Sequence, residues 1–489
     1  MSAIPFVQDD VVRRILDLLR QEHTAAYVTG GYVRDWLLGR ESKDLDLSVS
    51  APAIPMARRI ADRTGGAFYV LDDDLDAARV LYRSPDALEV DFARLRAPDI
   101  EADLGERDFS VNAMAVDVRA CYDQYPEVLD PLGGRDDLAT RTLRATSEHA
   151  FRSDPVRLLR AVRLAASVGL RIEPDTQSWM RRDAALISRT SAERIRQELV
   201  LIVAADGAAG HLRSLDDFGL LEPILPEVTA LKGITQSQPH VHDVYEHTLE
   251  TLNQVERLSA ERGSQLNALE REYLGAFSTQ LDAHGAVITS ERRSRRILLR
   301  FAALLHDVGK PAVRSVEPSG RIRFFEHERN GAGVAAGVMT RLRFSAQEAD
   351  RIGVIVVNHM RPGLLARDHS ATRKAVYRFF RDCGDAGLDV LQLSLADHLA
   401  TRGSRLVVGH YRDHLEVVKL MLEAYFYQME QVISPPPLVS GRDVMQLLGI
   451  PPGPRVGELL EAVREAQAEG TLCTAEDAHE FLRNCLARP

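Results

Sequence analysis

The sequence predicts an α+β fold in which a mixed α/β region, residues 1–145, precedes a long helical region. Short runs rich in β-branched and aromatic residues alternate with helical segments up to about residue 118. From about Ser147 these runs disappear, and apolar residues recur at the spacing of one helix face. We therefore expect a sheet near the N-terminus, followed by helical domains.

The first region begins with a predicted amphipathic helix over residues 9–20. Asp9 and Asp10 are its candidate caps, and the apolar residues on its buried side are Val12, Ile15, Leu16 and Leu19. The predicted strands that follow are AYVTG, LDLSVS, FYVL, ARVLYR and LEVDFARL, and the predicted helices among them are VRDWLLG and PMARRIADR. Strands and helices therefore alternate in this region.

The helical region is predicted to form three further domains. Its pattern runs through FRSDPVRLLRAVRLAASVGL and AERIRQELVLIVAA, and it is interrupted near GITQSQPH and at the three prolines 435–437. These breaks predict domains at residues 1–145, 146–234, 235–432 and 433–489. A charged segment, residues 259–296, is longer than a connection between two helices requires.

The composition is that of a globular protein with several domains. Of the 489 residues, 45% are hydrophobic and 27% are charged, which excludes disordered and membrane-embedded classes. No apolar run approaches the roughly 18 residues of a membrane span, and the first residues carry no secretion signal, so we expect a cytoplasmic protein. The four cysteines are scattered without a C-x-x-C pair, which indicates structural roles.

The charge distribution is uneven. A formal net charge of −10 argues against a surface that is basic throughout. Residues 151–200 nevertheless hold ten Arg against six Asp or Glu. This excess suits a channel for a phosphate backbone, and a solvated helix face would explain it equally well.

A paired glycine, a short helix and a strand with two acids follow one another in GGYVRDWLLGRESKDLDLSVS. Asp44 and Asp46 are two residues apart on the strand, so they share a face and can hold one or two Mg²⁺ ions. Gly30 and Gly31 allow phosphates to approach the backbone, and Arg34 offers a positive charge. These are the parts that phosphoryl transfer requires.

A third carboxylate is expected from a neighbouring strand. LEVDFARL offers Glu89 and Asp91 on one face, and we favour Asp91 as the third catalytic acid. Taken alone, an Asp-x-Asp pair is weak evidence, because solvent-facing acids on an edge strand look the same.

The complete string GGYVRDWLLGRESKDLDL resembles the signature of the class II tRNA nucleotidyltransferases and bacterial poly(A) polymerases, in the polymerase-β superfamily. The resemblance implies a polymerase-β-like α/β head, a helical neck, an HD domain and a helical tail. It also implies attack by a tRNA 3′ hydroxyl on CTP or ATP with Mg²⁺ and release of pyrophosphate.

Further segments match the family's motifs in order, and the resemblance gives their residues roles. ERDFSVNAMAVD corresponds to a ribose-binding motif, and DPLGGRDDLATRTLRA to a hinge between head and neck. FRSDPVRLLRAVRLAA corresponds to the motif whose side chains act as a template for the base, with Ser153 where the family usually has Glu. SAERIRQEL resembles the fifth motif and includes Arg194. The nucleotide-binding residues implied are Gly30, Gly31, Arg34, Arg107, Asp108, Asn112, Asp154, Arg157 and Arg160.

Asp154 and Arg157 are expected three apart on one helix, where an intrahelical salt bridge is the alternative to base recognition. The stretch FARLRAPDIEADLG looks shorter than in enzymes that build the complete CCA end. A CC-adding enzyme is therefore an alternative, as are an A-adding enzyme and a poly(A) polymerase.

The segments QPHVHDVYEHTLETL, LLHDVGKP and LSLADHLA resemble the HD phosphohydrolase superfamily. The ligands implied are His247, His306, Asp307 and Asp397, which suit Mg²⁺ or a divalent transition metal. His327 and His359 stand where binuclear members supply extra histidines, and Lys310 is expected to steady a phosphate. A phosphatase or cyclic phosphodiesterase acting on RNA ends is implied. A different alternative is an HD phosphohydrolase whose head only binds RNA.

Overall fold

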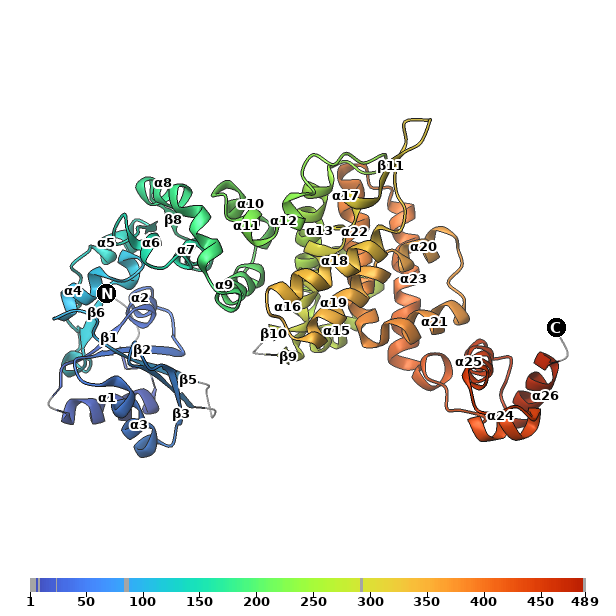
Figure 1. The fold of residues 1–489 in the computed structure, drawn as a ribbon, viewed down its shortest axis with the longest axis horizontal. Coiled ribbons are helices and arrows are strands. Elements are labelled where there is room, and N and C mark those ends of the chain that lie inside the picture. The colour runs from blue at the N-terminus through green and yellow to red at the C-terminus, as the bar shows by residue number, and fades with distance from the viewer. Residues whose placement is uncertain (1–5, 8, 23, 83–87, 291–292, 487–489) are drawn as a thin grey trace. The chain divides into compact units, whose positions relative to one another are not determined.

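The structure is a computed structural model that describes residues 6–7, 9–22, 24–82, 88–290 and 293–486. The chain divides into two compact units, which are considered separately (Figure 1). Unit 1 comprises residues 1–194 and 214–223, and unit 2 comprises residues 195–213 and 224–489.

Unit 1 contains a six-stranded sheet with the strand order β3-β4-β5-β2-β1-β6. Strands β2 and β5 are parallel, and the other neighbours are antiparallel. All five predicted strands are confirmed, and β6 is a short addition. The bounds are β1 (Ala26–Thr29), β2 (Asp44–Val49), β3 (Ala67–Asp72), β4 (Ala77–Tyr82), β5 (Leu88–Arg94) and β6 (Ala115–Asp117).

The register of the central strands brings the predicted acids together. Asp46 on β2 is paired with Asp91 on β5, and Asp44 is paired with Glu89. On the other side of β2, Asp46 is paired with Thr29 of β1, directly before the glycine pair. The sheet therefore places the acidic strand β2 beside both the glycine pair and the third carboxylate that the sequence predicted.

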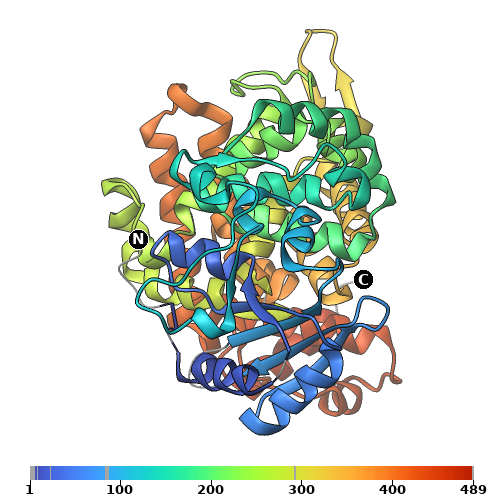
Figure 2. The same ribbon diagram turned by 90° about the vertical axis from the view of Figure 1, so that its left-hand side faces the viewer.

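Helices cover the sheet. The predicted first helix is confirmed as α1 (Asp10–Gln21), whose N-cap is Asp9 and whose four predicted apolar residues are buried. Helix α3 (Ala53–Thr64) packs against β3, β4 and β5, and α1 packs against α3, so both lie below the sheet in Figures 1 and 2. Helix α2 (Gly31–Leu37) packs against β1 and β2.

The remaining helices of unit 1 lead away from the sheet. They are α4 (Ile100–Gly105), α5 (Gly134–Ala139), α6 (Ala150–Ser153), α7 (Arg157–Leu164) and α8 (Pro174–Asp183). The expectation that Asp154 and Arg157 share one helix is wrong. Asp154 has extended backbone between α6 and α7, because Pro155 disfavours helical geometry in the residue before it.

Unit 2 is mainly helical. Its HD region packs α13 against α16 and α22, and α18 against α19. Two helices cross between the units: α9 (Ala192–Ala204) begins in unit 1, and α10 (Ala208–Asp217) ends in it. Helix α11 (Leu221–Ile224) lies in unit 1 except for its last residue. The other helices of unit 2 are α12 (Pro226–Thr229), α13 (Val244–Leu258), α14 (Ala268–Leu274), α15 (Ser278–Ala286), α16 (Arg295–Leu305), α17 (Lys310–Val313), α18 (His327–Arg341), α19 (Ala346–Asn358), α20 (Arg361–Arg367), α21 (Arg373–Cys383), α22 (Gly387–Arg402), α23 (Val408–Tyr427), α24 (Gly441–Leu448), α25 (Pro454–Glu469) and α26 (Ala475–Leu486). The last three form the predicted helical tail around a small core of their own.

The region after Ser147 is not wholly helical, contrary to the pattern. Strand β8 (Arg171–Ile172) pairs with β7 (Thr142–Leu143), and β9 (Ile288–Ser290) pairs with β10 (Arg293–Ser294). A hairpin joins β11 (Arg314–Val316) to β12 (Ile322–Phe324). Its turn contains Gly320 at φ +83°, a conformation that favours glycine. Strands this short leave too few residues for a period of two to be recognised.

The charged segment 259–296 builds a layer on the HD region. Glu270 of α14 is fully buried and accepts hydrogen bonds from Arg257 of α13 and Tyr411 of α23. His284 of α15 contacts Asp389 of α22 at 3.0 Å. The segment is therefore anchored by buried polar contacts. Among the helices that the structure describes, none combines the length and the apolarity needed to cross a membrane.

Candidate functional site

A cavity of about 420 Å³ lies in unit 1, over the ends of β2 and β5. Ten of the predicted residues line it, and together they include both glycines, two of the three acids and most of the predicted nucleotide contacts. They are Gly30, Gly31, Asp46, Asp91, Arg107, Asp108, Asn112, Asp154, Arg157 and Arg160. The cavity is large enough for a small-molecule ligand.

Asp46 lies against the paired glycine. Its Oδ2 accepts a hydrogen bond from the backbone N–H of Gly31 at 3.3 Å. A Cβ on Gly30, which has φ +70°, would lie only 2.7 Å from the same oxygen. The position therefore needs glycine for both its backbone and its space. Burial raises the pKa of Asp46, an effect that Arg107 opposes and Asp91 reinforces. A bound cation would relieve this strain on the ionised form.

The other two acids are arranged differently. Arg79 of β4 binds Asp91 through two hydrogen bonds of 2.7 and 2.8 Å and also pairs with Glu89 at 2.8 Å. Asp44 is exposed and does not line the cavity. Within the described part of the chain, these acids do not form a compact group of three candidate metal ligands. Asp46 is thus the predicted acid most directly inside the cavity.

Polar partners fix the predicted sugar-binding residues. Arg107 donates to the hydroxyls of Thr29 at 3.0 Å and Ser48 at 2.9 Å. Asp108 accepts from Arg160 at 3.0 Å and Asn112 at 3.2 Å. Burial alone would raise the pKa of Asp108, but Arg160 and Asn112 hold it below its ordinary value. Both side chains are thereby held at the cavity wall.

Arg34 lies outside the cavity lining, unlike the other predicted nucleotide-binding residues. It pairs with its neighbour Asp35 at 2.8 Å and donates to Asn112 at 2.8 Å. Its contact with Asn112 orients a residue that does line the cavity. Arg34 is therefore connected to the site through Asn112.

The predicted base-recognition residues are each held by a different partner. Arg194 binds both oxygens of Asp154, at 3.0 and 2.7 Å. Arg157 donates to the backbone carbonyls of Glu106 at 2.8 Å and Arg107 at 3.2 Å. A carboxylate and a guanidinium are thus fixed on the same cavity wall without pairing with each other.

Sequence reasoning missed several lining residues. Arg94 is the last residue of β5, Arg96 follows the strand, and Arg194 enters from the segment that resembles the fifth motif. With Arg107, Arg157 and Arg160 they give the cavity six arginines. The two arginines of LEVDFARLR are visible in the sequence, but only the fold shows that they line the same cavity as the acidic strand. Thr29 and Ser48 could have been found from the strand alternation, since Ser48 shares the face of Asp46.

The second predicted site is a buried cluster in unit 2. His247 and His306 form one candidate ligand group with Asp307, and His327 and His359 form another with the same Asp307. Asp397 of α22 lies 3.1 Å from Nε2 of His247. All four predicted ligands and both extra histidines therefore converge.

Backbone contacts select one tautomer for three of these histidines. The Nδ1 atoms of His306, His327 and His359 lie 2.7 to 2.8 Å from the carbonyl oxygens of Ala303, Phe324 and Val356. Each Nδ1 must donate its proton to its carbonyl, so each Nε2 has a lone pair whenever its ring is neutral. Burial lowers the pKa of His359 to about 3, and its neighbours His306 and His327 add to this effect.

The free imidazole nitrogens face negative or electron-rich atoms. Nε2 of His306 lies 3.2 Å from Asp307 Oδ2, and Nε2 of His327 lies 3.3 Å from Asp307 Oδ1. The Nε2 atoms of His247 and His306 are 3.3 Å apart. Such a convergence of lone pairs is unfavourable without a cation between them, so these residues fit a divalent metal.

Lys310 is expected from the sequence to steady a phosphate, but in the structure it contacts two protein side chains. Its Nζ lies 2.6 Å from Asp307 Oδ2 and donates to Gln236 at 2.7 Å. Burial alone would raise the pKa of Asp307, but His306 and Lys310 hold it well below its ordinary value. Lys310 therefore keeps the shared carboxylate ionised.

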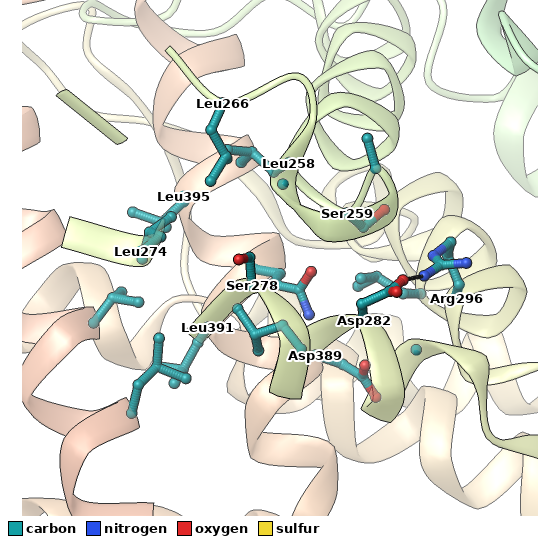
Figure 3. A pocket seen from close by; sticks show the side chains of 18 residues that line it. Leu258, Ser259, Leu266, Leu274, Ser278, Asp282, Arg296, Asp389, Leu391 and Leu395 are labelled. Carbon is teal, nitrogen blue, oxygen red and sulfur yellow. Dashed lines mark hydrogen bonds and ion pairs between the residues drawn. The ribbon is translucent and has the colours of Figure 1, made fainter. Parts of the chain in front are cut away.

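A second cavity, enclosed by the 259–296 segment and the helices beneath it, is shown in Figure 3. Its volume is about 30 Å³, close to the share of one water molecule. Leucines such as Leu266, Leu274 and Leu395 line most of it, and Asp282 pairs with Arg296 at one side. None of the predicted site residues lines this cavity, so it belongs to the packing of the segment.

Three family descriptions match successive parts of the chain. Residues 26–144 match the Poly A polymerase head domain, residues 169–232 the probable RNA and SrmB-binding site of polymerase A, and residues 244–402 the HD domain. The fold resembles the apo form of a CCA-adding enzyme, with a TM-score of 0.63 and 19% identity over 98% of this chain and 95% of that one. It also resembles the Thermotoga maritima CCA-adding enzyme complexed with tRNA, with a TM-score of 0.59 and 19% identity over 98% and 96% of the two chains.

Sequence relatives extend along nearly the whole chain. The A-adding tRNA nucleotidyltransferase of Deinococcus radiodurans is 36% identical over 94% of this chain and 95% of that protein. The CC-adding tRNA nucleotidyltransferase of Thermus thermophilus is 34% identical over 94% and 93% of the two chains. With the predicted α+β fold confirmed and the motif residues gathered around one cavity, the chain belongs to the tRNA nucleotidyltransferase family.

Proposed function

We propose that the protein extends the 3′ end of tRNA, with the terminal hydroxyl attacking the α-phosphate of CTP or ATP and pyrophosphate leaving. The observation that carries this proposal is the cavity in which Asp46 and the paired glycine lie among six arginines. Such a cavity suits a triphosphate beside a metal-binding acid, because guanidinium groups neutralise phosphate charge. The relatives' names support tRNA as the acceptor.

Mg²⁺ held by Asp46, with Asp44 and Asp91 as further oxygen ligands, would activate the hydroxyl and stabilise the leaving group. Gly30 and Gly31 let the triphosphate approach the backbone. Arg107, Asp108 and Asn112 position the sugar. Asp154 and Arg157, fixed by separate partners, present an acceptor and a donor to the base.

The nucleotides that are added can be identified by product length. Labelled tRNA transcripts ending before CCA, after the first C and after CC are each incubated with CTP alone, ATP alone and both. A CCA-adding enzyme completes all three, a CC-adding enzyme stops after the second C, and an A-adding enzyme extends only the CC transcript. Long ATP-dependent products indicate a poly(A) polymerase. No extension of any transcript would overturn the proposal.

Between β5 and α4, only residues 95–99 separate the strand from the helix. This short connection favours the CC-adding alternative over a complete CCA enzyme, whereas the first of the two relatives is A-adding. The three transcripts separate these alternatives directly.

The buried histidine cluster favours a second activity, and we infer a metal-dependent phosphohydrolase. Bound Mn²⁺, Ni²⁺, Fe or Mg²⁺ would polarise a phosphoester and supply a hydrolytic water. His247, His306, Asp307 and Asp397 would hold it, and His327 and His359 fit a second ion that shares Asp307. Metal-loaded protein is tested on 2′,3′-cyclic CMP and 3′-CMP. Lack of metal uptake would refute the assignment.

An HD phosphohydrolase with a head that only binds RNA is the alternative from another class. Full phosphohydrolase activity of the Asp44→Ala/Asp46→Ala double variant, in a protein that adds no nucleotides, would favour this alternative. The cytoplasmic location expected from the sequence stays a prediction.

A further inference from the structure

A groove of about 530 Å³ opens beside the HD cluster, between α20, α22 and α23. Its wall includes His359 and Asp397, two residues of the cluster itself. A molecule in the groove would therefore be in reach of any metal that the cluster holds. The volume is within the usual range for sites that bind small molecules.

Arg402, at the end of α22, is the unusual charge in this groove. It is half-buried, and its one hydrogen bond among the described residues is a long one of 3.4 Å to the carbonyl of His398. No carboxylate within the described ranges forms an ion pair with it. The other arginine in the groove, Arg367, is exposed and pairs with Asp368 at 2.8 Å.

A half-buried guanidinium without a partner is costly unless a ligand supplies the negative charge. Burial lowers the pKa of Arg402, and the charge of Asp397 only partly opposes this. A phosphate provides two oxygens in the geometry that guanidinium donors prefer. His398 adds a second unmet group, because its Nε2 is buried without a hydrogen-bond partner.

The opposite part of the lining is apolar. Met360 and Leu364 of the α20 region are each 37% exposed, which is high for large hydrophobic residues that face a groove. Gly363 and Ala366 complete this apolar surface. A base or ribose face can cover such side chains, whereas inorganic phosphate would leave them in water.

We propose that Arg402 is the residue of this groove that binds the phosphate of the HD cluster's nucleotide substrate, while the α20 side chains contact the nucleoside. Arg402 is then the residue that positions a phosphoester beside the HD cluster. The proposal rests on the phosphohydrolase function inferred for that cluster, and it adds the residue that recognises the phosphate of the substrate.

The wall opposite α20 is reinforced from the 259–296 segment. The ring of His398 lies 5.3 Å from that of Tyr411, and Tyr411 donates to buried Glu270 at 2.9 Å. His414 continues this wall, with its Nδ1 3.1 Å from Nδ1 of His398. The segment thereby gives the groove a rigid side.

The test measures binding of 3′-CMP, cytidine and inorganic phosphate to the full-length protein by isothermal titration calorimetry. We expect 3′-CMP to bind more tightly than either fragment. Arg402→Gln should weaken 3′-CMP binding at least about tenfold and leave cytidine unchanged, because a charge-assisted contact is lost. Arg402→Lys, which keeps the charge, should bind 3′-CMP with an affinity between those of wild type and Arg402→Gln. Arg405→Gln, an exposed arginine three residues further on, is the matched control and should bind 3′-CMP like wild type.

Equal 3′-CMP affinity of wild type and Arg402→Gln would overturn the proposal, as would cytidine binding as tightly as 3′-CMP. Mn²⁺ binding by the same variants is measured in parallel. Arg402→Gln with normal Mn²⁺ uptake and weakened 3′-CMP binding supports the groove. Arg402-dependent 3′-CMP binding in a protein that takes up no Mn²⁺ would leave the groove standing and reject the phosphohydrolase.

Discussion

In the head cavity, Asp46 is partly open to the cavity and Asp91 is already bound by Arg79, whereas the HD cluster buries four imidazoles around Asp307. The head therefore offers an incomplete set of oxygen ligands, which the phosphates of a nucleotide can complete. The HD cluster offers a full set of nitrogen and oxygen ligands before any substrate arrives. From this difference we predict that a metal ion enters the head with its nucleotide, whereas the HD region retains its metal ion without substrate.

The strongest test of this contrast is Asp46→Asn. Loss of the carboxylate should reduce nucleotide addition by about a thousandfold or more, because metal stabilisation of the transition state is worth several kcal/mol. The measurement is the single-turnover rate of CTP or ATP incorporation. Asp62→Asn, an exposed acid on α3, is the control. Hydrolysis by the HD region should not change, and a parallel loss there would refute the independence of the two sites.

The reciprocal variant is Asp307→Asn in the HD cluster. Both candidate ligand groups share Asp307, so the variant should abolish metal retention and lower phosphoester hydrolysis by about a thousandfold. Metal content after dialysis, measured by mass spectrometry, gives a readout apart from activity. Nucleotide addition should stay at the wild-type rate. A variant that retained its metal would contradict the view that Asp307 is the shared ligand.

Glu270→Gln tests whether the 259–296 segment contributes to the stability of the HD region and not to that of the head. Breaking a buried ion pair should lower the stability of unit 2 by about 3 kcal/mol, as measured by urea unfolding. Burial alone would raise the pKa of Glu270, but Arg257 holds it below its ordinary value of 4.5. Its stabilising contribution is therefore present above that value and lost as the pH falls through the lower folded-state pKa.

The difference between Glu270→Gln and wild type should accordingly shrink in acid. Glu272→Gln, an exposed neighbour on α14, is the matched control and should unfold like wild type. A constant difference down to low pH would show that Glu270 does not act through its charge.

The smallest expected effect is on the choice of base. Arg194→Gln releases Asp154 from its two hydrogen bonds and should change the ratio of kcat/KM for CTP and ATP by about tenfold. The ratio is measured on transcripts that accept each nucleotide. Arg189→Gln, an exposed arginine near the same helix, is the control. An unchanged ratio would remove Asp154 from base selection.

The sequence determined the order of the head strands along the chain, the acidic strand after the glycine pair and the candidate ligands of the HD cluster. Period-two and helical spacing are local properties, and the motifs join residues whose chemistry is meaningful at fixed spacing. Asp46 and Asp307 could therefore be selected before any fold was known.

Tertiary structure decided which side chains are paired. Only the sheet register places Arg79 against Asp91, and only the folded backbone at Pro155 and at the start of α9 brings Asp154 to Arg194. Only the arrangement of α20, α22 and α23 places Arg402 in a groove where no described carboxylate forms an ion pair with it. These contacts join residues far apart in the chain. The sequence around an arginine does not indicate which carboxylate it will pair with in the folded protein. Pairing and burial are properties of the folded molecule, because they depend on distance in space.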